Sequence, residues 1–205
     1  MRRKEFTIEE EEELALFLEE MSFGFLGMSH EDGFPRVTPL NFAYGNGVFY
    51  IHGSRAGEKM KLLKNDTRVT FSVAKEYALI PSYFTDAEMA CPASAFFKSV
   101  TVRGHAELIT DLEEKADAFS IFMHKLQPEG GYDTIDAKDP RYIPRLNGVA
   151  LIKIVPQEWT AKFKFGQNAK EEERQHIMDG LQKRGLDDDL TTIEMMKKYC
   201  PHHQS

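Results

Sequence analysis

Apolar and polar residues alternate in two rhythms along this chain, helical near both ends and strand-like in the middle. Between Leu14 and Met21 the apolar residues recur at helical spacing, which puts them on one face of a helix. We expect this first helix to begin at Thr7, a residue type suited to the N-cap, and to end near Glu20. The run of glutamates in its opening turns is typical of a solvated helix start.

The middle of the chain is predicted to form a series of short strands separated by turn residues. Gly45-Asn46-Gly47 lies between two of them and is a strong signal for a tight hairpin. The predicted strands cover Phe23–Ser29, Arg36–Tyr44, Val48–Gly53, Arg68–Ala74, Ala95–Ile109 (bent near Gly104) and Val149–Pro156, with Trp159–Phe165 as an extension of the last.

Further helices are predicted between and after these strands. They cover Ser54–Lys64, Asp111–Leu126, residues 169–184 (stopped by Gly185) and residues 191–199. The second of them turns Leu112, Ala116, Phe119, Met123 and Leu126 inward. Residues 75–93 are predicted to be irregular, and 127–148, with three prolines and three glycines, to be a long functional or mobile loop.

This order of elements favours one fold class. The strands come as hairpins with too few interleaved helices for a doubly wound sheet, so an antiparallel barrel of six or so strands with flanking helices is expected. We see no repeat and no low-complexity linker. We therefore predict a single domain over residues 1–205, with a core at about 8–160 and a helical extension at about 166–200.

Composition narrows the class of protein. Hydrophobic residues at 41% and charged residues at 29% are ordinary for a folded globular chain. No apolar run is long enough to span a bilayer, and the basic start has no apolar stretch behind it, so neither membrane insertion nor secretion is expected. Two cysteines, Cys91 and Cys200, make no disulfide framework, which favours the cytoplasm. A net charge of −7 argues against nucleic-acid binding.

The charge is nonetheless uneven, and one short segment is basic. Residues 53–64 hold four basic residues and one acidic residue. There Gly53 allows close approach, Ser54 offers a hydroxyl, and Arg55 and Lys59 offer positive charge, all at a predicted helix N-terminus. This arrangement indicates a phosphate site, although the spacing is not that of a P-loop and an ordinary basic helix surface remains an alternative.

Pro39 is the second unusual feature, because it lies inside a predicted strand and has no N–H to donate. It indicates an edge strand, a bulge or a backbone turned towards a ligand.

Taken together, these segments resemble the FMN-binding split barrels related to pyridoxamine 5′-phosphate oxidase, in particular the nitroimidazole-resistance-protein-like branch. The resemblance covers about residues 8–160. It is carried by Arg36-Val37-Thr38-Pro39-Leu40-Asn41-Phe42, the Asn-Gly hairpin, Tyr50-Ile51-His52-Gly53-Ser54, Lys59, Leu62, Asn65, Arg68-Val69-Thr70-Phe71 and Ser99-Val100-Thr101-Val102-Arg103-Gly104.

The resemblance implies an antiparallel split β-barrel that binds FMN and works as a homodimer with FMN at the subunit interface. The flavin ring would lie along the strand with Val37, Thr38, Pro39, Leu40 and Asn41, followed across the hairpin by His52 and Gly53. Its phosphate would be held by Ser54, Arg55 and Lys59, with a contribution from Phe97, Lys98 and Ser99, and Trp159 would approach the partner's flavin. The implied activity is flavin-dependent oxidation or reduction of a small organic substrate.

Some features depart from this pattern or leave alternatives. After Trp159 the chain lacks the Arg and His motif of the pyridoxamine oxidases proper, which argues against vitamin B6 as substrate. One alternative is a flavin sensor or carrier without turnover. Another is a haem-binding barrel with His52 and His105 as candidate ligands. A metal cluster at Cys200, His202 and His203 and a redox thiol at Cys91 are weaker ones.

Overall fold

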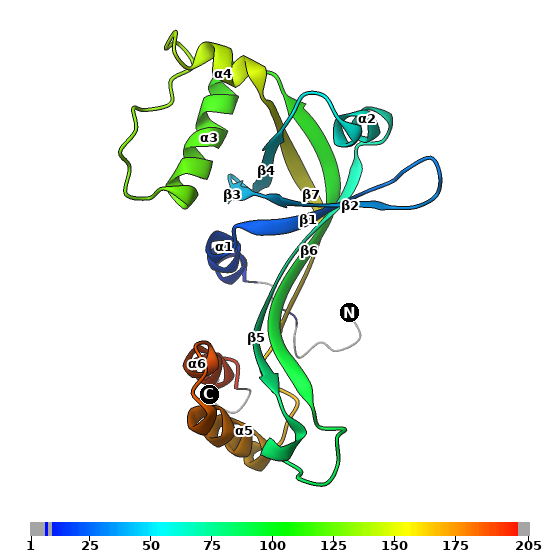
Figure 1. The fold of residues 1–205 in the computed structure, drawn as a ribbon, viewed down its shortest axis with the longest axis vertical. Helices are drawn as coiled ribbons and strands as arrows, with labels where there is room; N and C mark the ends of the chain where they lie inside the picture. Colours follow the sequence, from blue (N-terminus) through cyan, green and yellow to red (C-terminus); the bar gives the residue numbers. More distant parts are fainter. Residues whose placement is uncertain (1–6, 8–9, 201–205) are drawn as a thin grey trace. The chain divides into compact units, whose positions relative to one another are not determined.

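The computed structural model describes residue 7 and residues 10–200. It contains a mainly antiparallel seven-stranded sheet with the order β2-β1-β5-β6-β7-β4-β3, which runs from β2 to β3 without closing (Figure 1). The strands are β1 (Phe23–Met28), β2 (Arg36–Asn41), β3 (Ala43–Gly45), β4 (Val48–Gly53), β5 (Arg68–Ile80), β6 (Ser94–Ile109) and β7 (Ala150–Lys164). The helices are α1 (Glu11–Glu20), α2 (Glu58–Asn65), the 3-10 turn η2 (Ser82–Phe84), α3 (Leu112–Leu126), α4 (Ile143–Gly148), α5 (Glu171–Arg184) and α6 (Asp189–Lys198).

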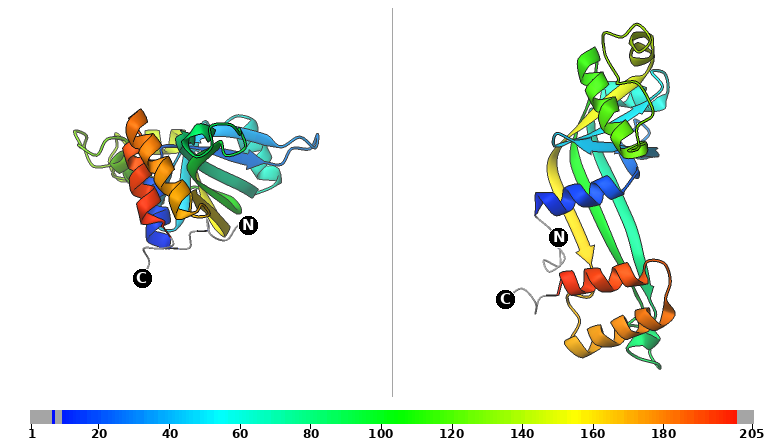
Figure 2. Two further views of the ribbon diagram at one scale, coloured as in Figure 1. Left: turned by 90° about the horizontal axis from the view of Figure 1, so that it is seen from below. Right: turned by 90° about the vertical axis from the view of Figure 1, so that its left-hand side faces the viewer.

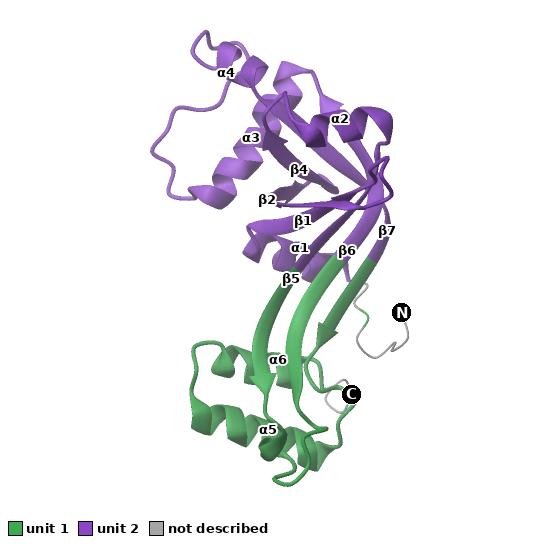
Figure 3. Cartoon of the chain, turned by 45° about the vertical axis from the view of Figure 1, so that its right-hand side comes forward, with its two compact units in different colours: residues 1–9, 74–100, 160–205 green, residues 10–73, 101–159 purple. Residues whose placement is uncertain are grey.

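The chain divides into two compact units (Figure 3). Unit 2 comprises residues 10–73 and 101–159, and the described part of unit 1 comprises Thr7, residues 74–100 and residues 160–200. The boundaries at 73/74, 100/101 and 159/160 fall within strands, so β5, β6 and β7 each contribute residues to both units. These boundaries differ from the predicted core and extension; a single domain over 1–205 stays a prediction.

The core of unit 2 is built around three phenylalanines. Phe42, Phe49 and Phe71 are each at most 1% exposed, and their ring centroids lie 5.2 to 5.9 Å apart. Aromatic pairs at this separation add to the free energy gained by burial. Phe42 also interrupts the predicted strand Arg36–Tyr44, which is two strands, β2 and β3, in the structure.

The core of unit 1 gathers around Phe165, which is fully buried. Its ring stacks on Tyr199 at 5.6 Å and meets Tyr77 edge-on at 5.3 Å. The helices α5 and α6 lie side by side (Figure 2), and α5 ends at Gly185 in the left-handed conformation, as the sequence predicted.

Two predicted helix starts are wrong. Thr7 is not an N-cap, because it forms an isolated bridge with Lys162, and α1 begins at Glu11 after the N-cap Glu10. The helix predicted from Ser54 begins only at Glu58, because Gly57 has a φ of 143°, which lies outside helical backbone geometry.

Three further expectations need correction. The predicted irregular stretch 75–93 begins as strand, since β5 runs to Ile80, and the predicted loop 127–148 ends in the helix α4. In α3, Leu126 is 53% exposed, whereas Lys115, Ala118 and Phe122, which the pattern did not place inward, are buried. The apolar pattern misplaced this face because a lysine occupies a buried position.

Within the described part of the chain, no helix has both the length and the apolar composition that crossing a bilayer requires.

Candidate functional site

β2 is the outermost strand at one end of the sheet, which explains why it tolerates Pro39. Its side chains alternate, with Val37, Pro39 and Asn41 exposed and Thr38 and Leu40 half-buried. The edge position agrees with one of the three explanations that the sequence allowed for the proline.

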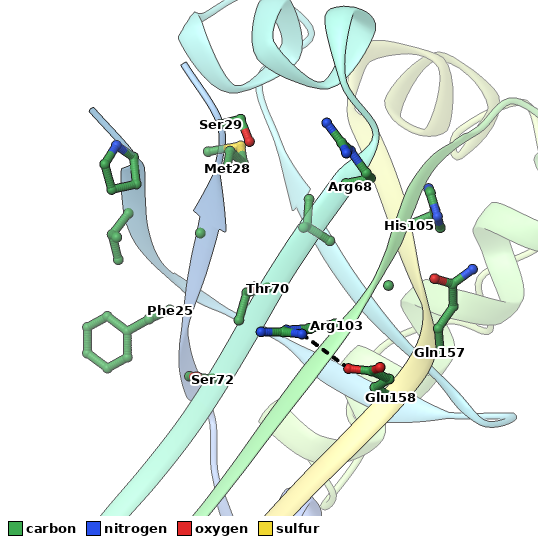
Figure 4. A pocket seen from close by; sticks show the side chains of 15 residues that line it. Phe25, Met28, Ser29, Arg68, Thr70, Ser72, Arg103, His105, Gln157 and Glu158 are labelled. Carbon is green, nitrogen blue, oxygen red and sulfur yellow. Dashed lines mark hydrogen bonds and ion pairs between the residues drawn. The ribbon is translucent and has the colours of Figure 1, made fainter. Parts of the chain in front are cut away.

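The pairing register of β2, β1 and β5 places a row of residues side by side across these three strands. Val37 lies opposite Gly27 of β1, and Gly27 lies opposite Thr70 of β5. A glycine in the middle of this row leaves room above the sheet. The row is part of a groove of about 860 Å³ that extends over β1, β5, β6 and β7 (Figure 4).

The far wall of this groove is polar and was not predicted as part of the flavin site, although His105 was a candidate haem ligand. Arg103 and Glu158 form an ion pair at 3.4 Å (Figure 4). The Nδ1 atom of His105 lies 2.9 Å from the hydroxyl of Thr67. Arg68 also lines the groove, with its guanidinium on Asp66 at 2.7 Å. Of the residues proposed for the flavin ring, only Val37 is among those that line the groove.

Lys59 is the strongest candidate for an anion contact. It lies in the first turn of α2 and is half-buried, and burial lowers the pKa of its ammonium. A Cβ atom placed on Gly53 would lie 3.1 Å from the Lys59 Nζ atom, so the ammonium rests on the bare backbone at the end of β4. Lys59 makes no hydrogen bond or ion pair with any residue of the described chain. A partly desolvated cation without a counter-ion favours a bound anion.

Helix α2 adds to this anion site. No side chain caps its N-terminus at Gly57, so the N–H groups of the first turn are left for another acceptor. Ser54 lies in the loop just before the helix, where its hydroxyl accepts a hydrogen bond from the Ala56 N–H at 3.1 Å. Ser54 and Lys59 therefore flank the same short loop.

Arg55 makes a different contact. Its guanidinium donates a hydrogen bond of 2.6 Å to the carbonyl of Asn147, at the C-terminal end of α4. The buried ammonium of Lys115 donates to the carbonyls of Leu146 and Val149 at 2.7 and 3.0 Å. Arg55 and Lys115 thus donate hydrogen bonds to carbonyls at the C-terminal end of α4. This contact gives Arg55 a structural role.

Arg36 is a candidate that the site prediction omitted. It begins β2, and its guanidinium bonds Glu58 at 3.1 Å and Asp32 at 2.8 Å. The hydrogen bond from Arg36 holds the pKa of the Asp32 carboxyl down at about 2. Because Glu58 is the first residue of α2, this ion pair places the start of β2 beside Lys59. The position of Arg36 directly before Val37 was the available signal.

His52 lies on β4 beside Gly53, between the predicted ring and phosphate positions. Its ring faces Phe119 and Phe122 of α3, with centroids 5.8 and 5.1 Å away. This partial burial lowers the pKa of His52, and the charge of Lys59 lowers it further. Both effects favour the neutral imidazole.

The other predicted residues are spread over both units. Phe97, Lys98 and Ser99 lie on the part of β6 that belongs to unit 1, where the Lys98 ammonium lies over the rings of Tyr77 and Phe163 at 5.4 and 5.0 Å. Trp159 belongs to unit 2, is 37% exposed and packs on Tyr44 and Phe49 at 5.9 and 5.5 Å. The structure brings together the β2, β4 and α2 candidates.

The predicted metal alternative falls mostly outside the described residues, which exclude His202 and His203; Cys200 is described and buried. Among the residues that are described, no group of three or more His, Cys, Asp or Glu side chains is placed to hold a metal ion.

Comparison with solved structures agrees with the fold. A 5-nitroimidazole antibiotic resistance protein from Bacteroides thetaiotaomicron matches with a TM-score of 0.60 and 25% identity, over 76% of this chain and 85% of that one. The flavocytochrome Anf3 from Azotobacter vinelandii matches with a TM-score of 0.64 and 24% identity, over 78% of this chain and 69% of that one. A FAD- and haem-binding protein from Mycobacterium smegmatis matches with a TM-score of 0.62 and 17% identity, over 76% of this chain and 71% of that one. Among proteins with curated functions, none matches.

The family comparison covers the same region as the resemblance found in the sequence. The model of the pyridoxamine 5′-phosphate oxidase family matches residues 10–163, which include the groove, α2 and all the residues expected to bind the flavin. That is more than half of the chain, and the open antiparallel sheet with flanking helices is consistent with the split barrel of this family. The chain therefore belongs to the pyridoxamine 5′-phosphate oxidase family.

Proposed function

We propose that this protein binds FMN and acts as a flavin-dependent oxidoreductase on a small organic substrate. The observation that carries the proposal is Lys59, a half-buried ammonium on the bare backbone of Gly53 at the uncapped start of α2. A phosphate would supply the missing counter-charge and would accept hydrogen bonds from the first turn of the helix. Family membership and the flavin named in the solved neighbours support this reading.

In this proposal the phosphate contacts are ranked by geometry. Lys59, Ser54 and the N–H groups of α2 form the primary contact. Arg36 is a second cation, which would exchange its bond with Glu58 for one with the phosphate. Arg55 contributes mainly through its charge, because its guanidinium is bonded to Asn147.

The ring system would lie along β2 from Val37 to Asn41, beside the groove. FMN, when bound, supplies the capacity to take up and release a hydride. The protein's part is to orient the ring against β2, to leave room for a substrate in the groove and to offer backbone N–H groups to the ring. We further propose a homodimer in which Trp159, which is partly exposed, approaches the partner's flavin.

The test compares FMN with riboflavin, which lacks the phosphate, by fluorescence titration of the purified protein. Wild-type protein should bind FMN more tightly than riboflavin. In Lys59→Met, FMN affinity should fall about 10- to 100-fold, the value of one charge-assisted hydrogen bond, while riboflavin affinity stays the same. Lys64→Met removes the same charge from the last turn of α2 and is the matched control. Equal binding of FMN and riboflavin by wild type would refute the phosphate site, and FAD in the same titration decides between the two flavin nucleotides.

Turnover is tested separately. Loss of the yellow absorbance with NADH or NADPH, followed by reoxidation with a quinone or a nitroaromatic compound, would support an oxidoreductase. A bound flavin that neither donor reduces would instead support a flavin carrier.

A further inference from the structure

Unit 1 contains a cavity in which Phe97 is the one lining residue that was also expected to contribute to the flavin phosphate. It has a volume of about 730 Å³ and lies among the start of β6, the end of β7 and the first turns of α5. All of its lining residues belong to unit 1. Three apolar side chains that are at most 7% exposed, Ile80, Phe96 and Ile177, form its floor. The volume and the apolar floor are typical of sites for small organic molecules.

Two lysines give one wall of this cavity a positive charge. Lys162 and Lys164 are two residues apart on β7 and so point to the same face of the strand. The Lys162 ammonium lies 5.1 Å from the centre of the Phe97 ring, and the Lys164 ammonium donates a hydrogen bond to the Ser94 hydroxyl. Each ammonium carries three N–H donors on a flexible stem, so it can turn a donor towards a bound anion.

The carboxylates in the cavity lining bind backbone N–H groups. One oxygen of Asp86 accepts hydrogen bonds from the N–H groups of Glu88 and Met89 at 2.9 and 3.0 Å, which lower the pKa of the carboxyl. One oxygen of Glu173 accepts from the Lys170 N–H at 3.2 Å in the capping box of α5. These acids are held in place by the turns they stabilise, whereas the lysines end on flexible stems that can move to a ligand.

A neutral polar group completes the lining. The side-chain amide of Asn168 is exposed and makes no hydrogen bond to any residue in the described part of the chain. It offers both a donor and an acceptor to a bound molecule.

We propose that this cavity is a second binding site, for a small organic anion with an aromatic or similarly bulky apolar body. The apolar body would lie on Ile80, Phe96 and Ile177, and the anionic group would bind the ammonium groups of Lys162 and Lys164. The end of β5, the start of β6 and the loop between them form this site together with β7, the turn after it and α5, so the C-terminal part of the chain shares in a binding role.

Cys91 provides a reporter for the test. The chain has two cysteines, of which Cys91 is exposed and lines the cavity and Cys200 is buried. The rate of Cys91 alkylation by iodoacetamide is followed by intact mass, with 1-naphthoate as the probe anion and no flavin added. At ten times its Kd the probe leaves about one site in eleven free, so labelling should slow about tenfold.

Two comparisons make the result specific. The neutral analogue 1-naphthalenemethanol, at the same concentration, should give little protection. The variant Lys162→Gln/Lys164→Gln should lose the protection by naphthoate, and Lys183→Gln/Lys197→Gln, which removes two exposed lysines of the same unit, should keep it. Unslowed labelling of wild type by naphthoate, equal protection by the neutral analogue, or protection that survives in the first variant would overturn the proposal. If the first variant fails to fold, the comparison of the two probes on wild type decides.

Discussion

Lys125 links the pH of the solution to the stability of unit 2. Its ammonium donates a hydrogen bond of 2.8 Å to the carbonyl of Leu18, near the end of α1, and lies 4.0 Å from the centre of the Phe42 ring. Burial lowers the pKa of this ammonium from 10.5 to about 8, although the charge of Glu19 opposes the shift. The folded protein therefore releases the proton of Lys125 more easily than the unfolded chain does.

The sign and size of the effect follow from linkage. Below pH 8 both states hold the proton, and the folded state carries the full cost of the buried charge. Between pH 8 and 10.5 the unfolded chain binds more protons, so the free energy of unfolding rises with pH. The whole pKa difference corresponds to at most about 3 kcal/mol, and we expect about 2 kcal/mol because the side chain is partly exposed to solvent.

The assay is urea unfolding at pH 7, 8, 9 and 10, followed by circular dichroism, on wild type and Lys125→Met. Groups that titrate in both proteins, such as Tyr44, cancel in the difference between the two. The free energy of unfolding of wild type relative to the variant should rise by about 2 kcal/mol from pH 7 to 10. A difference that stays constant, or that falls with pH, would refute the assignment of a buried charge to Lys125.

Two further substitutions test packing and charge. Gly104→Ala should destabilise the protein by about 3 kcal/mol, because the new Cβ would lie 2.1 Å from the Val155 carbonyl oxygen. The control Gly148→Ala, whose new Cβ would meet nothing within 4 Å, should change the stability little. Thermal melting of both variants compares them. Asp189→Asn should cost about 3 kcal/mol at pH 7, because Asp189 is 1% exposed and bound to Arg184. Since that contact lowers the carboxyl pKa below 3.8, the deficit measured by urea unfolding should shrink as the pH falls below that value; a deficit that stays constant would contradict it.

The sequence predicted the elements whose signals are local. The hairpin at Gly45-Asn46-Gly47 is present, with Asn46 at φ 55° and Gly47 at φ 77°, and Gly185 ends α5 as expected. The start of α2 was misplaced because helix propensity does not report the positive φ at Gly57. The break at Phe42 was missed because its cause is tertiary, the burial of this ring against Phe49 and Phe71.

The candidate site shows the same limit. The basic segment and Lys59 were found from charge and glycine content, which are local properties. Arg36 was missed as a site residue because its place beside α2 depends on the ion pair with Glu58, 22 residues away in the sequence. The polar wall of the groove was missed for the same reason, since Arg103 and Glu158 are 55 residues apart and meet only when the strands pair.

The assembly of unit 1 from separate chain segments has a consequence for biosynthesis. Arg184 of α5 donates a hydrogen bond to the carbonyl of Leu79, 105 residues earlier in the chain. On the ribosome, the 74–100 segment therefore lacks its helical partners until α5 and α6 have been made. No single cleavage between two residues would release either unit intact, so expressing one alone would require joining its segments through new linkers.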